Sequence, residues 1–269
     1  MRVALAIGGL DPCSGAGIVA DARALRAAGT WPCTVAAALT IQSTRGVRRV
    51  EAVAASVLKA QLVELARDVD IRVVKLGALG SVENMRVAAG FVRRIRAHVV
   101  VDPVNMPSRG RVNLQGEFDV KALRGLASCA TLVTPNLPEA EYMLSTTIGT
   151  ADARDAAVAL REQLDCRAVL LKGGHADGAM VTDWLANRSG CHRLQRKRVD
   201  GPDVHGTGCV LAALIAGRMV ATKLTDPQKL TDEGLLEAVR WASGRLAQLR
   251  RRPVRIGAGM PVLDVRGAR

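Results

Sequence analysis

The segment of the chain with the clearest chemistry is a glycine-rich stretch that ends in a cysteine. His205-Gly206-Thr207-Gly208-Cys209 stands directly before an apolar run at 210–217, which reads as a buried helix. Small residues let successive backbone N–H groups turn toward one point, and a helix start adds unpaired N–H donors and the positive end of its dipole. The pattern predicts an anion-binding turn that could hold a transferring phosphoryl group. An ordinary glycine-rich loop before a core helix would have the same composition.

Oxygen-bearing and cationic side chains follow other strand-like runs. Asp102, Asn136 and Glu139 offer carboxylate and amide oxygens, which Mg²⁺ accepts together with water and substrate phosphates. Lys172 ends an apolar run beside two glycines and could place a positive charge on a nucleotide phosphate. Each of these residues could instead have a purely structural role, since capping and turn residues, first-turn helix acids and solvated loop lysines are common.

A second glycine-rich loop, residues 8–17, leaves the first strand-like run. Its Gly15-x-Gly17-x-x-Ala20 spacing matches a dinucleotide-binding fingerprint, which makes an NAD enzyme a competitor. The next strand-like run ends in Thr40-Ile41-Gln42 without the acid that would hold a ribose hydroxyl. No GxxxxGK[ST] phosphate loop occurs in the sequence either. These two observations weaken the NAD interpretation.

Strand-like runs alternate with alanine-rich helical stretches over the whole chain, which is typical of an α/β protein with a mostly parallel sheet. Strands are expected near 3–7, 34–41, 71–76, 99–101, 131–134 and 168–171, with an antiparallel pair near 179–185 and 192–199. Helices are expected near 18–28, 54–66, 83–95, 151–164 and 233–249, besides those that begin at about 138 and after Gly206. Ligands of such sheets bind at the carboxyl ends of the strands, where the polar residues above are found.

Composition narrows the class of protein. The 269 residues are 49% hydrophobic, contain no apolar run of membrane-spanning length, and show no linker, so we expect a single domain over 1–269. The N-terminus lacks the features of a secretory signal, which predicts a cytoplasmic protein without membrane contact. The six cysteines form no CxxC pair or zinc-ligand spacing.

The chain is strongly basic, with a formal net charge of +13 and basic clusters at 93–96, 196–198 and 250–252. Nucleic acid is nevertheless not the expected partner, because the clusters are separated and aromatic residues make up only 2% of the chain. A small anionic substrate explains the charge comparably well.

The ordered set of motifs resembles the ribokinase-like superfamily, and within it the hydroxymethylpyrimidine/phosphomethylpyrimidine kinases of thiamine biosynthesis. The matching segments are Gly8–Asp21 (similar to AGSDPSGGAGIQAD), Ala38–Thr44 (ALTAQNT), Val101–Val104 (VDPV), Val133–Glu141, Leu171–His175, His205–Cys209 and Ile256–Val262. This resemblance spans nearly the whole chain. It implies a three-layer α/β/α sandwich with a mostly parallel central sheet and a small lid or flap, and it favours a homodimer.

The resemblance also implies roles for individual residues. Gly9, Asp21, Gln42 and the Val104 backbone would line a pyrimidine pocket. Asn136, Lys172 and Thr207 would bind ATP, and Asp102 and Glu139 would hold Mg²⁺. Gly206, Gly208 and Cys209 would form the catalytic anion hole, where Cys209 either accepts the hydroxymethyl proton or only positions that group. Residues of these types suit phosphoryl transfer from ATP to the pyrimidine alcohol and then to its monophosphate.

Three departures from the family pattern bear on the substrate. Asn105–Gly110 replaces MVAKSG, so the usual lysine is absent and Arg109 is its candidate substitute. Ala78 stands where the family has the methionine of KTGML, which would enlarge the pocket, and Gly201–Val204 replaces the usual residues before His205. A pyridoxal or pyridoxine kinase of the same fold is therefore an alternative function. A catalytically inactive pyrimidine-binding sensor is another.

Overall fold

A computed structural model describes residues 1–104, 119–149, 151–174, 178–221 and 230–266 of the chain. Within them one sheet of nine strands runs in the order β3-β2-β1-β4-β5-β6-β7-β8-β9. The strands are β1 (Val3–Leu10), β2 (Trp31–Ser43), β3 (Gly46–Ala52), β4 (Ile71–Leu76), β5 (His98–Val101), β6 (Leu132–Val133), β7 (Val169–Leu171), β8 (Met180–Asn187) and β9 (Gly190–Lys197). The six neighbouring strands β2, β1, β4, β5, β6 and β7 are parallel to one another. The strands β3, β8 and β9 extend the sheet at its two edges through antiparallel pairs.

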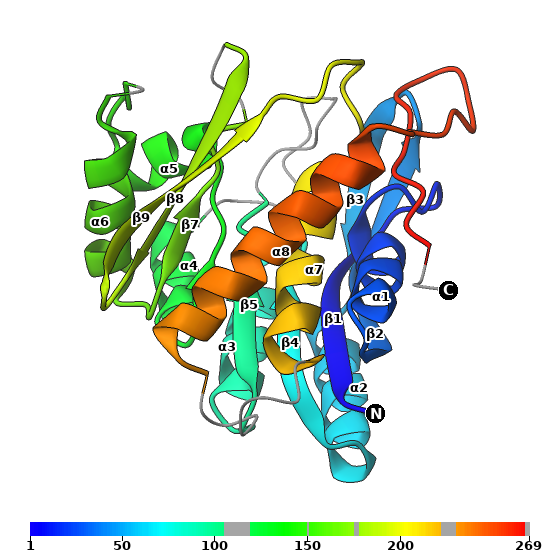
Figure 1. Cartoon of the computed structure of the whole chain (residues 1–269). Helices are drawn as coiled ribbons and strands as arrows, with labels where there is room; N and C mark the ends of the chain where they lie inside the picture. Colours follow the sequence, from blue (N-terminus) through cyan, green and yellow to red (C-terminus); the bar gives the residue numbers. More distant parts are fainter. Residues whose placement is uncertain (105–118, 150, 175–177, 222–229, 267–269) are drawn as a thin grey trace.

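Helices cover both faces of the sheet (Figure 1). One layer contains α1 (Gly17–Ala27), α7 (Thr207–Ala221) and α8 (Asp232–Arg250), which pack on one another and on the central strands. The other layer contains α2 (Ala55–Asp68), α3 (Val82–Val92), α4 (Val120–Ala127), α5 (Leu137–Leu144) and α6 (Ala153–Leu164). The expected α/β/α sandwich with a mostly parallel sheet is confirmed.

Alternation along β1 shows how the sequence builds these two layers. Leu5 and Ile7 belong to the apolar core on the α2–α6 side, and Ala4 and Ala6 belong to the core on the α7 side. Successive strand residues point to opposite faces, so the small alanines leave room for α7 to lie close to the sheet. That helix is apolar almost all round and its middle is buried, as a central helix requires.

Most predicted elements are present, with shifted ends. The sequence prediction missed β3, an edge strand whose Arg48, Arg49 and Glu51 are exposed and give little hydrophobic signal. It also missed the eight-residue helix α4, which carries Gly125. The predicted lid, including Asn105–Gly110 and Arg109, lies outside the described residues.

Candidate active site

The polar residues singled out in the sequence meet at the carboxyl edge of the sheet. Asp102 directly follows β5, and Asn136 and Lys172, which follow β6 and β7, form an isolated parallel bridge with each other. Because β5, β6 and β7 are parallel neighbours, their ends lie at the same edge. Three residues from distant parts of the chain are thereby collected into one place.

Asp102 and Lys172 form the centre of this group. Nζ of Lys172 lies 2.9 Å from Oδ1 of Asp102, and the Thr134 hydroxyl donates to the same oxygen at 3.0 Å. Burial alone would raise the pKa of Asp102, but the nearby Lys172 and Lys75 and these hydrogen bonds hold it below its usual range. Burial likewise opposes the charge on Lys172, whereas Asp102 and Glu139 raise its pKa. Both groups are therefore charged at neutral pH.

Glu139 and Asn136 are held by a capping box at the start of α5. The Asn136 side chain accepts from the Glu139 N–H at 2.8 Å, and Oε2 of Glu139 accepts from the Asn136 N–H at 2.8 Å. The helix-capping role, which was the alternative to a magnesium-binding role for these two residues, is therefore present in the structure. The box also fixes the Glu139 carboxylate near Lys172, whose pKa it influences.

The glycine turn begins α7 and faces the Asp102–Lys172 pair. Gly206 has φ of +79°, and a Cβ there would overlap the carbonyl oxygen of Gly15, so only glycine fits. A Cβ on Gly208 would lie 3.4 Å from Nζ of Lys172 and 3.9 Å from Oδ2 of Asp102. The helix start therefore offers N–H donors to an anion beside a fixed lysine.

A second lysine–aspartate pair is sealed inside the protein. Lys75, on β4, places its Nζ 2.9 Å from Oδ2 of Asp21, on α1, and both side chains are only 1% exposed. Burial raises the pKa of Asp21 to about 6 even though Lys75 opposes the shift, and Asp21 in turn raises the pKa of Lys75. The structure thus places Asp21 against Lys75, and its direct contact with a pyrimidine stays a prediction.

Cys209, in the first turn of α7, lies within the electrostatic influence of both pairs. Burial raises the pKa of its thiol to about 12; Lys75 lowers it, while Asp102 and Asp21 raise it further. The sulfur is therefore protonated at neutral pH, despite the helix N-terminus. This favours a positioning role for Cys209 over that of a thiolate base.

The first glycine-rich loop is tied to the turn through His205. Its Nε2 lies 3.0 Å from Oδ2 of Asp11 and 2.9 Å from Nε2 of Gln42. Asp11 also accepts backbone N–H groups of Cys13, Gly15 and Ala16, which closes the loop around its carboxylate. Burial opposes the charge on Asp11, but His205 and the N–H donors lower its pKa.

Two further predicted pocket residues border the same region. A Cβ on Gly9 would lie 3.8 Å from the Cβ of Ala78, so the two small residues face each other. The Val104 N–H donates to the carbonyl oxygen of Asp102 at 2.8 Å, which fixes the backbone there.

Sequence reasoning missed the parts played by Lys75, His205, Asp11 and Thr134. One signal was available, because Lys75 is a cation inside the apolar strand Ile71–Leu76 and such a charge needs a buried partner. Asp11 and His205 are 194 residues apart in the sequence, and nothing local indicates that they meet.

The described residues include no group of three or more His, Cys, Asp or Glu side chains placed to hold a metal ion. No described helix is both long and apolar enough to cross a membrane.

Comparisons with known proteins show the family to which the chain is similar. The sequence pattern of the phosphomethylpyrimidine kinase family matches residues 11–262. The chain is 36% identical to the hydroxymethylpyrimidine/phosphomethylpyrimidine kinase of Escherichia coli over 252 residues, 91% of each protein. Among solved structures it resembles the phosphomethylpyrimidine kinase of Clostridium difficile, with a TM-score of 0.75, 28% identity and coverage of 92% of this chain and 99% of the other.

A pyridoxal kinase is also similar. The Staphylococcus aureus enzyme in complex with AMP-PCP and pyridoxal has a TM-score of 0.82 and 25% identity, covering 98% of this chain and 93% of its own. The overall backbone therefore does not separate the two kinds of vitamin kinase, and the residues of the pocket must.

Proposed function

The chain belongs to the phosphomethylpyrimidine kinase family, and from that premise we propose that it phosphorylates 4-amino-5-hydroxymethyl-2-methylpyrimidine with ATP and then phosphorylates the resulting monophosphate. It is a kinase of thiamine biosynthesis, as its relatives are. The observation that carries the residue-level proposal is the glycine turn of α7, whose Gly208 lies beside Lys172 and Asp102.

Phosphoryl transfer depends chiefly on alignment and on stabilising charge. The N–H groups at Gly206, Gly208 and Cys209 are proposed to donate to the oxygens of the transferring phosphoryl group. Lys172 would hold the nucleotide phosphates, with Asn136 and Thr207 beside them. The Cys209 thiol would orient the hydroxymethyl group toward the γ-phosphate.

The oxygens near Lys172 suit a magnesium ion that arrives with ATP. Oδ2 of Asp102 is buried and has no hydrogen-bond partner among the described residues, which fits a hard cation in need of an oxygen ligand. Asp102 would hold Mg²⁺ directly and Glu139 would support its shell. When bound, the ion would neutralise charge on the ATP phosphates.

Substrate recognition is assigned to the pocket between the first loop and the turn. Gln42 offers an amide donor and acceptor to an aminopyrimidine edge, beside Gly9 and the backbone of Val104. Asp21, which is 1% exposed and paired with Lys75, is proposed to support this pocket from behind its surface. Nε2 of Gln42 lies 2.9 Å from Nε2 of His205, which supports this proposal because it places the Gln42 amide beside the glycine turn.

The oligomeric state and location remain part of the proposal. Leu39 and Ile41, near one end of β2, are 46% and 41% exposed, and this exposed apolar pair supports the proposal of a homodimer. Light scattering would measure the mass in solution. A cytoplasmic location stays a prediction from the sequence.

Pyridoxal phosphorylation is the second candidate, and the small Ala78 facing Gly9 is the observation that favours it. The test incubates the purified protein with Mg-ATP and, separately, the pyrimidine alcohol, its monophosphate, pyridoxal and pyridoxine, with products identified by mass spectrometry. Mono- and diphosphate from the pyrimidine support the first proposal. Phosphorylation of only the vitamin B6 compounds supports the second, and ligand binding without any product supports an inactive sensor.

An Ala78→Met variant is the matched control for this experiment. If Ala78 enlarges the pocket, the methionine should reduce the rate with pyridoxal more than the rate with the pyrimidine. Equal effects on the two rates would show that Ala78 does not determine which substrate is preferred.

A further inference from the structure

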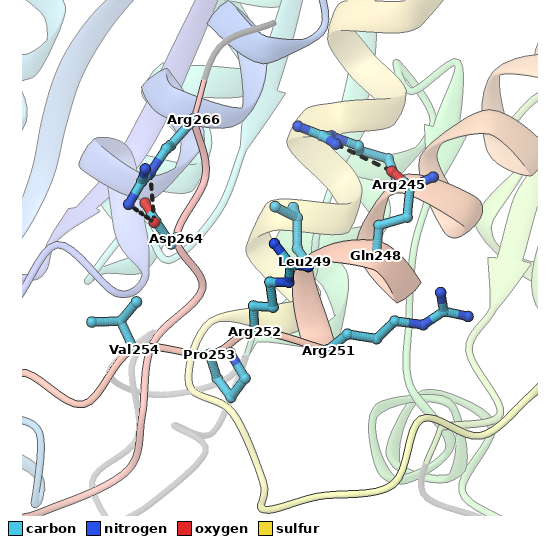
Figure 2. Close-up of a pocket in the computed structure, with 9 residues that line it drawn as sticks. All are labelled: Arg245, Gln248, Leu249, Arg251, Arg252, Pro253, Val254, Asp264 and Arg266. Atoms are coloured by element: carbon cyan, nitrogen blue, oxygen red, sulfur yellow. Dashed lines mark hydrogen bonds and ion pairs between the residues drawn. The ribbon is translucent and has the colours of Figure 1, made fainter.

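A hollow of about 660 Å³ lies at the carboxyl end of α8, apart from every residue assigned above. It is lined by Arg245, Gln248, Leu249, Arg251, Arg252, Pro253, Val254, Asp264 and Arg266. Figure 2 shows the α8 residues on one side and Asp264 with Arg266 on the other. The basic cluster at 250–252, which the kinase function leaves unexplained, thus contributes two arginines to a concave site.

The charges in this hollow are not balanced by the protein. Among the residues that the structure describes, four arginines and one carboxylate line it, and Asp264 already accepts from Nε of Arg266 at 2.7 Å and pairs with its Nη2 at 2.6 Å. Arg245 donates to the neutral amide oxygen of Gln248 at 3.1 Å. The guanidinium groups of Arg251 and Arg252 have no ion pair or hydrogen bond within the described part of the chain.

The α8 terminus explains part of this charge, since cations near the last carbonyls of a helix are stabilising. It does not explain why Arg266, 14 residues beyond Arg252 in sequence, lines the same hollow. Guanidinium groups gathered around one space repel one another unless an anion lies between them, and their forked N–H donors match phosphate oxygens.

We propose that this hollow binds a small anion that carries two linked phosphate groups. The volume suits a small molecule, and several guanidinium groups can share the four or more exposed oxygens of a diphosphate. The buried side chain of Leu249 and the half-exposed Val254 form an apolar part of the wall, which suits an organic diphosphate. A long nucleic acid is the less suitable occupant, because the described residues that line the hollow include no aromatic side chain to stack a base.

The test is a calorimetric titration of the full-length protein with inorganic pyrophosphate. The wild type should show two classes of site, because the glycine turn of α7 is proposed to bind phosphate as well. An Arg245→Gln/Arg252→Gln variant should keep one class and bind at the other at least tenfold more weakly. The matched control is Arg94→Gln/Arg96→Gln, which removes two exposed arginines from another basic cluster and should titrate like the wild type.

A second variant controls for a folding defect in Arg245→Gln/Arg252→Gln. Val254→Glu introduces a carboxylate at a position that is 38% exposed, so it should weaken the same class of site without loss of the thermal transition. Unchanged titrations in both test variants would overturn the proposal. Equal weakening in the Arg94/Arg96 control would also overturn it, as unspecific charge attraction.

Two readouts separate this proposal from others. Kinase activity should persist in Arg245→Gln/Arg252→Gln, so a failure of the proposed catalytic function is seen independently of pyrophosphate binding. A single-stranded oligonucleotide is titrated in parallel. If only oligonucleotide binding depends on Arg245 and Arg252, the hollow belongs to a nucleic-acid surface and the diphosphate proposal is wrong.

Discussion

Two lysine–aspartate pairs in this protein share one geometry and differ in their surroundings. Lys75–Asp21 and Lys172–Asp102 both have an N–O distance of 2.9 Å. Both aspartates are at most 1% exposed, but the Lys75 side chain is 1% exposed and the Lys172 side chain 13%. A sealed lysine has no access to another anion, whereas an accessible one can also attract a phosphate. We therefore infer that the first pair supports the site and the second belongs to it.

Replacing Lys75 should have the largest effect on stability. Lys75→Met leaves Asp21 buried without its cation, which should cost about 3–5 kcal/mol of unfolding free energy at pH 7. Denaturant unfolding monitored by circular dichroism measures this loss. Lys75 lowers the pKa of Asp21 in the wild type, so in the variant this carboxyl becomes neutral at a higher pH. The cost should therefore fall as the pH drops toward about 6 and level off below it, where Asp21 is neutral in both proteins.

The control for Lys75→Met removes both charges. A Lys75→Met/Asp21→Leu variant should recover most of the lost stability, because it buries no unpaired ion. If the double variant is no more stable than the single one, Lys75 contributes packing and the contrast between the two pairs is lost.

Replacing Lys172 should act mainly on catalysis. Lys172→Gln keeps a hydrogen-bond donor for Asp102 but removes the charge, and kcat should fall about 10²- to 10³-fold, as for other transition-state donors. Steady-state kinetics measure this fall, and thermal unfolding should show a smaller change than in Lys75→Met. A Lys172 variant that unfolds as readily as Lys75→Met, yet turns over normally when folded, would reverse the assignment of the two pairs.

His205 tests whether a contact outside the two pairs positions the substrate. His205→Leu removes the nitrogen that lies near Gln42 and Asp11, so KM for the pyrimidine should rise about tenfold, near the net value of one hydrogen bond. The KM for ATP serves as the internal control and should change little. An effect confined to ATP would place His205 in nucleotide binding instead.

Cys209 should report the electric field between the two pairs. Asp102 raises the pKa of this thiol, so Asp102→Asn should lower it and speed alkylation by iodoacetamide several-fold at pH 9. Peptide-resolved mass spectrometry gives the rates, and Cys33, whose pKa is raised by burial alone, is the control. In the wild type the rate at Cys209 should keep rising toward pH 12. Saturation near pH 9 would contradict a Cys209 pKa raised to about 12.

Much of the fold could be read from the sequence because its central strands are apolar and its helices are long. Ile71–Leu76 was expected at the ends where the structure has it, since four of its six residues are Ile, Val or Leu, as in a buried parallel strand. The edge strand Gly46–Ala52 was not expected, because an exposed edge carries charges that mask the period of a strand.

In the candidate site, too, some features could be predicted from the sequence and others could not. Asp102, Asn136 and Lys172 could be placed together in advance because each follows a strand expected to be parallel, and such strands end at one edge. The Asp21–Lys75 pair could not be placed in advance. Its residues come from a helix and a strand 54 positions apart, and only the packing of α1 on the sheet decides that their side chains meet.

By itself the sequence determined the class of fold, the order of the motifs and the glycine turn, because these depend on local periodicity and on a backbone geometry that only glycine adopts without strain. The tertiary structure alone decided which charges are partners, which are sealed from water, and which arginines share a hollow. Those properties depend on distances between remote segments and on the exclusion of solvent, and neither is encoded at any single position.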